Sequence, residues 1–217
     1  GFILQTGLAP GYVNNLAVHL IESFEKKYGV NQLEKLAMRV GALTQYSESP
    51  HFYGFTWSTI GVATEYVKNS EAVRNHEITR LPSISERETL IINGRKYEAD
   101  LTSGGAADLP HAFKDRIKQI DYKTIRYPGH FDWVKSILSQ GDDTNKIKHL
   151  EETMLKHVPH IEDDVIVIYA AVTGYDKDGV LRSLQQGYHI YPLEIGGITM
   201  RAIQTCTAAP LVECARL

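Results

Sequence analysis

The stretch TLIINGRKYEADL, from Thr89 to Leu101, best indicates how this chain folds. Two runs of strand-forming residues flank the dipeptide Asn93-Gly94, and both turn residues tolerate a positive φ, so the stretch predicts a β-hairpin. A second hairpin is expected further on, because strand-like runs at Val165–Tyr175 and Val180–Tyr191 are separated only by a short turn. Hairpins join neighbouring strands in antiparallel order, so the sheet should be largely antiparallel.

The other elements follow from the spacing of apolar residues. Helical spacing from Val13 to Phe24 predicts an amphipathic helix with Gly29 as its stop. Strands are expected over Glu34–Leu43 and Asp121–Tyr127. A further helix is expected from the cap Ser58 to about Val67, with Ile60, Ala63, Tyr66 and Val67 inward, and another over Phe131–Leu138. The Asp142–Thr144 loop should precede a helix with Ile147, Leu150, Met154 and Leu155 on one face. The last helix is expected over Ile198–Cys214, where Pro210 should kink or end it.

These helices do not alternate with single strands as they would in a doubly wound fold. We therefore predict an α+β fold with a mixed, largely antiparallel sheet and helices on one face. No low-complexity linker or internal repeat divides residues 1–217, so we expect a single domain. The chain begins at Gly1 with an apolar, strand-like piece, GFILQTGLAPG, which suggests a fragment of a longer protein.

Composition limits the kinds of partner. The chain has 217 residues, 43% of them hydrophobic, which is enough for a sizeable core. A formal net charge of -3 and the absence of a basic run argue against a nucleic-acid partner. No apolar stretch approaches the roughly 20 residues that span a bilayer, and the first residues lack the basic flank of a signal peptide. We therefore expect no membrane partner and a cytoplasmic location.

The stretch DYKTIRYPGH, from Asp121 to His130, is the strongest candidate for chemistry. Arg126 carries a permanent charge and a planar set of donors that fits a carboxylate through two hydrogen bonds. Pro128-Gly129 should stop the strand and leave Arg126 and His130 at its end, where binding residues often collect. The stretch therefore indicates a carboxylate-binding site, although a local salt bridge before an ordinary turn fits it equally well.

Polar and aromatic residues elsewhere could complete such a site. The imidazole of His130 could act as a base, since Arg126 four residues earlier favours its neutral form. Trp57 lies just before the candidate cap Ser58, and Lys123 and Thr124 precede Arg126 on the same strand. Tryptophan is more often a core or interface residue than a ligand, so Trp57 also has that simpler interpretation.

Other common sites find no support in the sequence. The G-x-G-x-x-G turn of a dinucleotide-binding domain is absent, and GLAPG at Gly7–Gly11 fits either a helix N-terminus facing a polar ligand or, more simply, a strand-to-helix turn. His157 and His160 form a close pair, but no second cluster of ligands accompanies them, so we expect no metal site. The sequence has neither a G-x-S-x-G elbow nor a convincing Cys-His pairing.

Several stretches together resemble the C-terminal domain of the saccharopine dehydrogenase and lysine 6-dehydrogenase family. They are GLAPGYVNNLA from Gly7, FTWSTIGVATEY from Phe55, TSGG from Thr102, DYKTIRYPGH from Asp121 and IQTCTAA from Ile203. The resemblance covers nearly the whole chain, and YKTIRYPGH is its most specific part. The chain departs from the family pattern at Thr6, where Cys often precedes the GLxPG turn, and at Pro210, which interrupts the last helix.

The resemblance implies a fold similar to that of the C-terminal domain of glyceraldehyde-3-phosphate dehydrogenase. Members of the family begin with a Rossmann domain that holds NAD or NADP, and their C-terminal domain supplies substrate contacts and the dimer interface. On this basis Thr124, Ile125 and Arg126 correspond to the segment that binds a substrate carboxylate, and Pro10 and Gly11 to the turn near the nicotinamide. Because this chain contains no Rossmann sequence, no cofactor is expected to bind to it alone.

The resulting hypothesis is the substrate-binding and homodimerisation domain of an NAD(P)-dependent oxidoreductase that acts on the C–N bond of an amino acid such as saccharopine or lysine. Arg126 would fix the α-carboxylate, Thr124, Trp57 and Ser58 would add contacts, and His130 or Lys123 would handle the amine proton. Two alternatives stay open. One is a non-catalytic dimerisation or carboxylate-sensing module of the same fold, and the other is an enzyme of polyamine synthesis with the same imine chemistry.

Overall fold

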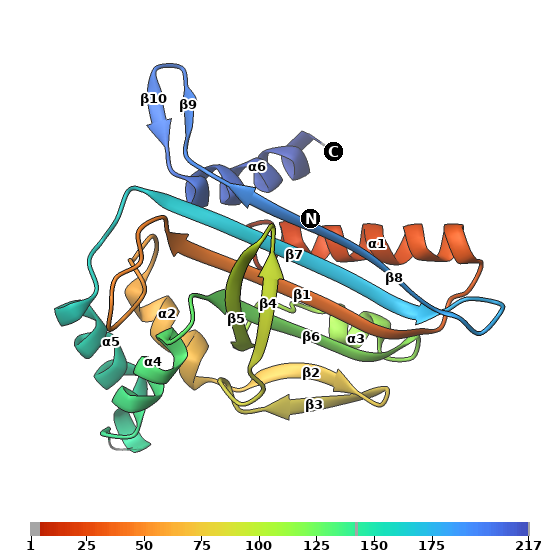
Figure 1. Ribbon diagram of the computed structural model, residues 1–217, viewed down its shortest axis with the longest axis horizontal. Helices are drawn as coiled ribbons and strands as arrows, with labels where there is room; N and C mark the ends of the chain where they lie inside the picture. Colours follow the sequence, from red (N-terminus) through yellow and green to blue (C-terminus); the bar gives the residue numbers. More distant parts are fainter. Residues whose placement is uncertain (1–4, 142, 217) are drawn as a thin grey trace.

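The computed structural model, which describes residues 5–141 and 143–216, is built around one mixed sheet. Its strand order is β3-β2-β6-β1-β7-β8, and the β4–β5 hairpin is attached through β6 (Figure 1). β1 (Leu33–Thr44) is parallel to β6 (Ile117–Arg126), and the other pairs in this sheet are antiparallel. The other strands are β2 (Ser70–Arg74), β3 (Glu77–Leu81), β4 (Glu88–Ile92), β5 (Arg95–Leu101), β7 (Asp164–Tyr175) and β8 (Leu181–Ile190), with β9 (Leu193–Ile195) and β10 (Ile198–Met200) as a separate hairpin.

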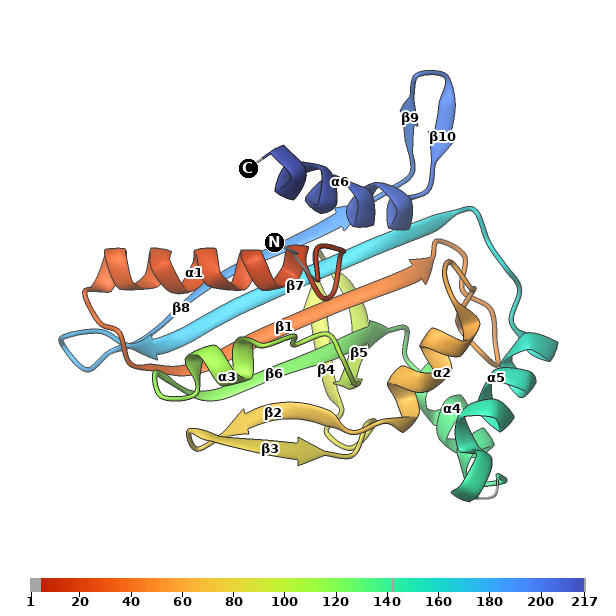
Figure 2. The same cartoon turned by 180° about the vertical axis from the view of Figure 1, so that it is seen from behind.

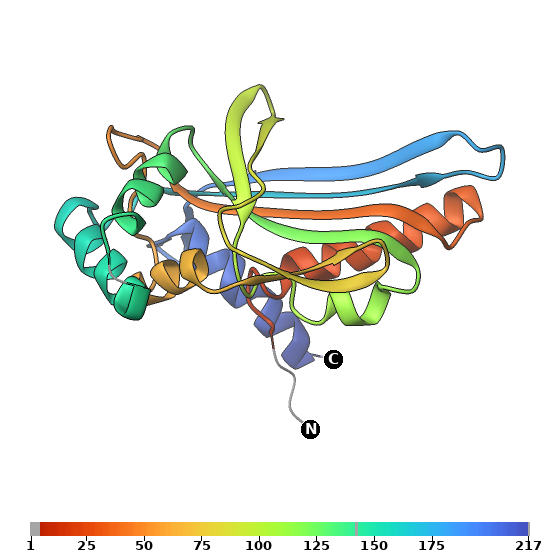
Figure 3. The same cartoon turned by 90° about the horizontal axis from the view of Figure 1, so that it is seen from below.

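The helices form two groups (Figures 2 and 3). One group covers a face of the sheet and consists of α1 (Tyr12–Tyr28), α3 (Leu109–Phe113) and α6 (Ala202–Arg216). The other packs beyond the end of the sheet where β1 and β6 finish, and consists of α2 (Thr59–Val67), α4 (His130–Leu138) and α5 (Lys146–His157), which follows a short 3-10 turn. The β4–β5 hairpin rises from the opposite face of the sheet in Figure 3. The predicted α+β class, with its mixed and largely antiparallel sheet, is confirmed.

The central strand β1 is buried on both faces. Leu36 and Met38 pack with Leu20 of α1 in the main core, which fills the space between the sheet and the first group of helices. Leu43 points to the opposite face and packs with Tyr97 of the β4–β5 hairpin. Alternate residues of β1 therefore enter different cores, because successive side chains of a strand point to opposite sides.

The local signals read from the sequence have the expected physical causes. At the β4–β5 turn, Asn93 and Gly94 have φ of 49° and 78°, the positive values that such a two-residue turn requires. α1 ends at Gly29, which adopts the left-handed conformation with φ of 66°. The hydroxyl of Ser58 accepts a hydrogen bond from the backbone N–H of Gly61 at 3.2 Å and so caps α2.

Two expected core residues are exposed. Ile60 is 46% exposed because α2 turns Val62, Ala63 and Tyr66, rather than its first turn, toward the core that it shares with α4 and α5. Leu155 is 49% exposed, whereas Leu150 and Met154 of the same helix face that core. The predictions for Ile60 and Leu155 were therefore wrong, because the buried face of each helix is narrower than the apolar residues of the sequence suggest.

The predicted start of the last helix at Ile198 was also wrong. Residues Ile198–Met200 form β10, and α6 begins only at Ala202. The buried carboxylate of Asp164, at the start of β7, accepts hydrogen bonds from the N–H groups of Ala202 and Ile203, both at 2.7 Å. A carboxylate at a helix N-terminus satisfies free N–H groups and interacts favourably with the helix dipole, so Asp164 sets this boundary from a distant part of the chain.

Pro210 lies inside α6 and does not end it, because the helix continues to Arg216. Residue Asp142 of the predicted helix cap and the strand-like residues 1–4 lie outside the described part of the chain. Within the described part, no helix combines the length and apolar character needed to cross a membrane.

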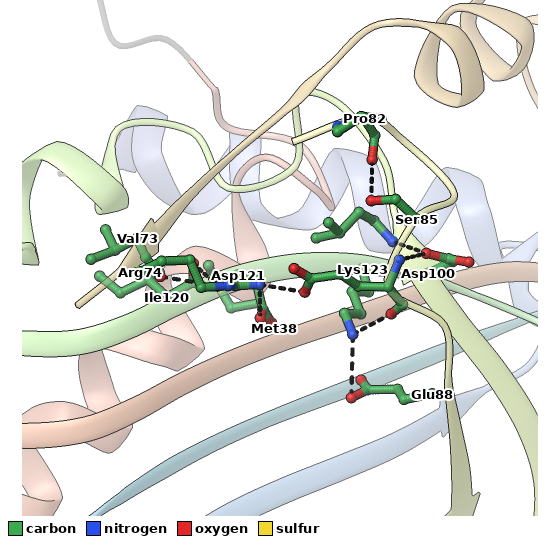
Figure 4. A network of polar contacts seen from close by, with 12 residues as sticks. Met38, Val73, Arg74, Pro82, Ser85, Glu88, Asp100, Ile120, Asp121 and Lys123 are labelled. Atoms are coloured by element: carbon green, nitrogen blue, oxygen red, sulfur yellow. Dashed lines mark hydrogen bonds and ion pairs between the residues drawn. The ribbon is translucent and has the colours of Figure 1, made fainter. Parts of the chain in front are cut away.

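Charged side chains form a buried network on the hairpin side of β6 (Figure 4). Asp121 pairs with Arg39 of β1 at 2.7 Å and with Arg74 of β2 at 2.9 Å. Glu88 of β4 pairs with the same Arg39 and, at 3.4 Å, with Lys123. Burial alone would raise the pKa of Asp121, but the surrounding cations, Arg39 first, hold it below its usual value. The network therefore ties four strands together through ionised groups.

We expect Arg39→Met to lower the free energy of unfolding by about 3–5 kcal/mol, because it leaves buried carboxylates without their main counterion. Urea denaturation at neutral pH measures this change. The matched control is Arg80→Met, since Arg80 is 78% exposed and its pair with Glu71 is long, at 3.8 Å. The control should change the free energy of unfolding by no more than about 0.5 kcal/mol. Equal losses in the two variants would show that the network contributes nothing special to stability.

Candidate functional site

A cavity of about 320 Å³ lies on the helix-covered side of the sheet, beside the end of β6. Its wall is mostly apolar, so a charge that borders it is poorly solvated. The lining residues come from the N-terminal turn (Gly7–Pro10), β1 (Val40, Ala42), the loop before α2 (Trp57), α2 (Glu65), β6 (Tyr122, Thr124, Arg126) and α6 (Ile203, Thr207).

Arg126 supplies a buried positive charge to this cavity. Its Nε donates a hydrogen bond to the hydroxyl of Tyr66 at 2.6 Å, and its Nη1 donates to the carbonyl of Ile125 at 2.9 Å. The guanidinium also stacks over the ring of Tyr53, 4.7 Å from its centroid. Burial alone would lower the pKa of Arg126, but Tyr66, Tyr53 and Glu65 raise it above its usual value. Within the described residues no carboxylate forms an ion pair with Arg126, so its charge is not neutralised by direct contact.

His130 acts on Arg126 indirectly, through the hydroxyl of Tyr66. Its Nδ1 lies 2.6 Å from the carbonyl oxygen of His51, which can only accept, so Nδ1 carries the proton. Its Nε2 then accepts a hydrogen bond from the hydroxyl of Tyr66 at 2.9 Å, and the oxygen of Tyr66 stays free to accept from Arg126. Burial, helped by the charge of Arg126, lowers the pKa of His130 to about 3. This neutral imidazole positions Arg126 through Tyr66 and does not line the cavity.

Glu65 brings a second ionisable group to the wall. It lies on α2, directly before Tyr66, and its side chain forms no hydrogen bond or ion pair with the described residues. Burial raises the pKa of its carboxyl to about 7, although the nearby charge of Arg126 acts in the opposite direction. Near neutral pH the cavity therefore holds a permanent cation and an acid that can be present in either protonation state.

The structure brings part of the predicted site together. Thr124, Arg126, Trp57 and Pro10 all line the same cavity. The hydroxyl of Thr124 lies 2.6 Å from that of Thr102, which orients it from the neighbouring loop. These residues come from separate parts of the chain, so their meeting is a result of the fold.

Other predicted residues lie elsewhere. Ile125 and Lys123 point to the opposite face of β6, where Ile125 joins the core of the β4–β5 hairpin and Lys123 joins the ionic network. Ser58 caps α2, and Gly11 is the N-cap of α1. Neither Ser58 nor Gly11 lines this cavity. Lys123 is separated from the cavity by the sheet, and His130 by Tyr66, so neither is in place to receive a proton from a ligand there.

Within the described residues, no cluster of three or more His, Cys, Asp or Glu side chains is arranged to hold a metal ion. The His157 and His160 pair adds no such cluster. Cys206 and Cys214 of α6 are both free and only partly buried. The ionisable side chains that line the cavity are Arg126, Glu65 and Tyr122.

We compared the chain with known protein families and solved structures. Residues 7–213 match the saccharopine dehydrogenase C-terminal domain. The chain belongs to this family. A solved structure with the same fold is the apo, histidine-tagged saccharopine dehydrogenase (L-Glu forming) of Saccharomyces cerevisiae, with a TM-score of 0.72 and 14% sequence identity. The match covers 97% of this chain and 63% of the yeast chain, so this chain spans less than two thirds of the yeast enzyme's length.

Sequence reasoning missed two residues of the site in this saccharopine dehydrogenase C-terminal domain. Tyr66 was expected to be a core residue, and it is buried, but its hydroxyl also joins Arg126 to His130. Glu65 was not considered. Its signal in the sequence was the position of a carboxylate directly before the inward-facing Tyr66, on a helix with no other charged residue. Acidic side chains are rarely buried unless a partner or a function requires them.

The buried His130 should make the stability of the domain fall at acid pH. Its folded pKa of about 3 lies below the value near 6.5 expected in the unfolded chain, so the unfolded state binds more protons between these limits. The stabilisation is complete above pH 6.5 and is lost as the pH falls toward 3. From pH 7.5 to pH 5 we expect His130 to account for a loss of about 2 kcal/mol.

Urea denaturation of wild type and His130→Gln at both pH values measures this contribution. The variant should be less stable at pH 7.5 but should lose about 2 kcal/mol less than wild type on acidification. His157→Gln is the control, because His157 is exposed, and it should follow wild type. The same loss in wild type and His130→Gln would exclude His130 as the source of the pH dependence.

Proposed function

We propose that this chain is the substrate-binding domain of an NAD(P)-dependent oxidoreductase that acts on the C–N bond of an amino acid of the saccharopine or lysine type. The observation that carries the proposal is Arg126, a buried cation at the wall of a cavity with no acidic partner in contact. A permanent charge of this kind is costly unless an anion compensates for it. The family membership is consistent with an amino-acid carboxylate as that anion.

The geometry of Arg126 suits a carboxylate. A guanidinium has five N–H donors, and the two hydrogen bonds to Tyr66 and Ile125 leave the others for a ligand. Tyr66 and the ring of Tyr53 hold the group in one orientation, so little conformational entropy remains to be lost on binding. Thr124, on the same face of β6, offers a hydroxyl beside it. The apolar part of the wall then accommodates the carbon chain of the substrate.

The family generally uses NAD or NADP, and the N-terminal turn fits a place beside the nicotinamide. Its cavity-lining part, Gly7–Pro10, carries no charged side chain and so would not repel the positively charged ring of an oxidised nicotinamide. When bound, the nicotinamide would accept the hydride from the carbon that bears the amine. The role of the present residues is to fix the substrate by its carboxylate and to exclude water. We propose that a dinucleotide-binding domain acts together with this chain.

We expect Arg126→Lys to weaken the binding of an amino acid by about tenfold, because the charge is kept while the two-point fit to a carboxylate is lost. Isothermal titration calorimetry with L-lysine and with saccharopine on the 217-residue chain measures the change. Arg80→Lys, at an exposed position, is the control and should bind as wild type does. If affinity is the same in Arg126→Lys, this residue does not hold the carboxylate and the proposed function loses its main support.

We also propose that the domain forms a homodimer through the region that follows β7. β8 is an edge strand, and the β9–β10 hairpin after it exposes Leu193, Ile195 and Ile198. Figure 1 shows this hairpin projecting from the body of the molecule. An unpaired edge and a group of exposed apolar side chains are features of a surface that a second chain covers.

In light scattering after size exclusion, wild type should have the mass of a dimer, and Ile198→Asp should shift it to a monomer. On association the introduced aspartate would be buried among apolar side chains without water or an opposite charge, and this cost weakens the dimer. Ile91→Asp, at an isoleucine on the β4–β5 hairpin that is 75% exposed compared with 65% for Ile198, should leave the dimer intact. A monomeric wild type would contradict the proposal, and dissociation by Ile91→Asp alone would move the interface to the other hairpin.

A further inference from the structure

The carboxylate of Glu65 and the guanidinium of Arg126 border the same cavity without touching each other. Both residues line it, and each shifts the pKa of the other, so their charges are close. Nevertheless no ion pair joins them. Opposite charges that are near each other across an open cavity leave room for a ligand that carries the two complementary charges.

Nothing else in the described part of the chain satisfies Glu65. Its side chain has no hydrogen-bond partner, and the charged or titratable groups that influence it or are influenced by it are Arg126 and Tyr122 of β6, Tyr66 of α2 and Tyr53. The three tyrosines are neutral near pH 7, because burial raises the pKa of each above its ordinary value. Arg126 is therefore the only cation among these neighbours, and a cationic ligand group would find no competitor in contact with Glu65.

We propose that Glu65 binds the ammonium group of an α-amino acid whose carboxylate is held by Arg126. This inference rests on the proposed function and names the group that recognises the amine. An α-amino acid presents its carboxylate and ammonium on adjacent atoms, so it offers each protein charge an opposite one. Each contact of this kind is a charge-assisted hydrogen bond, which is stronger than a hydrogen bond between neutral groups.

The other polar groups at the cavity do not offer the same recognition. Thr124, Thr207 and Tyr122 are neutral and bind an ammonium less strongly than a carboxylate does. His130 is enclosed behind Tyr66 and keeps both ring nitrogens occupied. Glu65 is thus the only anionic side chain among the residues that line this cavity.

The test uses three carboxylates with the same six-carbon skeleton. L-norleucine carries an α-amine, 6-aminohexanoate carries a terminal amine, and hexanoate carries none. Calorimetric titrations of the 217-residue chain at pH 8, where Glu65 is ionised, should show L-norleucine binding at least about tenfold more tightly than hexanoate. In Glu65→Gln this preference should fall below about twofold, while hexanoate binds at least as well as it does to wild type, because a nearby negative charge has been removed.

Glu22→Gln is the matched control, because Glu22 is exposed on α1, and it should keep the wild-type preference. The preference for L-norleucine over hexanoate should also increase between pH 6 and pH 8. Glu65, whose carboxyl has a pKa of about 7, loses its proton over this range, so its attraction for an ammonium grows while its repulsion of a bare carboxylate grows too. This pH dependence should be absent from Glu65→Gln.

The outcomes separate this inference from the function on which it rests. If Glu65→Gln keeps both the preference and its pH dependence, Glu65 does not bind the amine, but Arg126 can still hold the carboxylate. If 6-aminohexanoate binds as tightly as L-norleucine and only its binding depends on Glu65, the α-amine assignment is wrong. If wild type binds none of the three, the proposed function fails as well.

Discussion

The burial of one positive charge, that of Arg126, organises this end of the domain. Arg126 is 1% exposed, and a guanidinium in that environment needs partners for its donors. Tyr66 provides an oxygen from α2, Tyr53 provides a ring from the loop before it, and His130 of α4 orients the hydroxyl of Tyr66. All of these partners are neutral. They satisfy the geometry of the guanidinium without cancelling its charge, so the charge remains available at the cavity.

The alternation of β6 explains why one strand carries two separate electrostatic systems. Tyr122, Thr124 and Arg126 point toward the cavity, whereas Asp121 and Lys123 point to the other side of the sheet. On that other side Asp121 and Lys123 are each paired with an opposite charge, which is typical of ionic groups that serve stability. On the cavity side the charges border a mostly apolar space without pairing. The same ten-residue strand thus separates the ionic network from the cavity, because its side chains alternate with a period of two.

Local patterns predicted most of the elements, but not the interactions that depend on distant residues. The Asn93-Gly94 hairpin and the Gly29 helix stop could be recognised because their signals lie within a few residues. The start of α6 could not, because the carboxylate that caps it belongs to Asp164, 38 positions earlier than Ala202. The position of Arg126 at a strand end was predictable, since a proline and a glycine follow it. Its link to Tyr66, 60 positions away, depends on the packing of α2 against the sheet end, which no local pattern indicates.

The stretches that carry the family resemblance converge on the cavity, although they are scattered along the chain. GLAPG and the α6 stretch line it directly, as do Trp57 and Glu65 from the stretch that begins at Phe55. The TSGG stretch acts from behind: Thr102 orients Thr124, and Gly105 lies so close to the ring of Tyr122 that an added Cβ would come within 2.3 Å of it. The same stretches also contribute buried residues to all three hydrophobic cores, for example Leu8, Phe55 and Ile125. The segments that form the cavity wall are therefore held in place by the cores on either side of the sheet and beyond its end, because each wall segment also contributes buried side chains to a core.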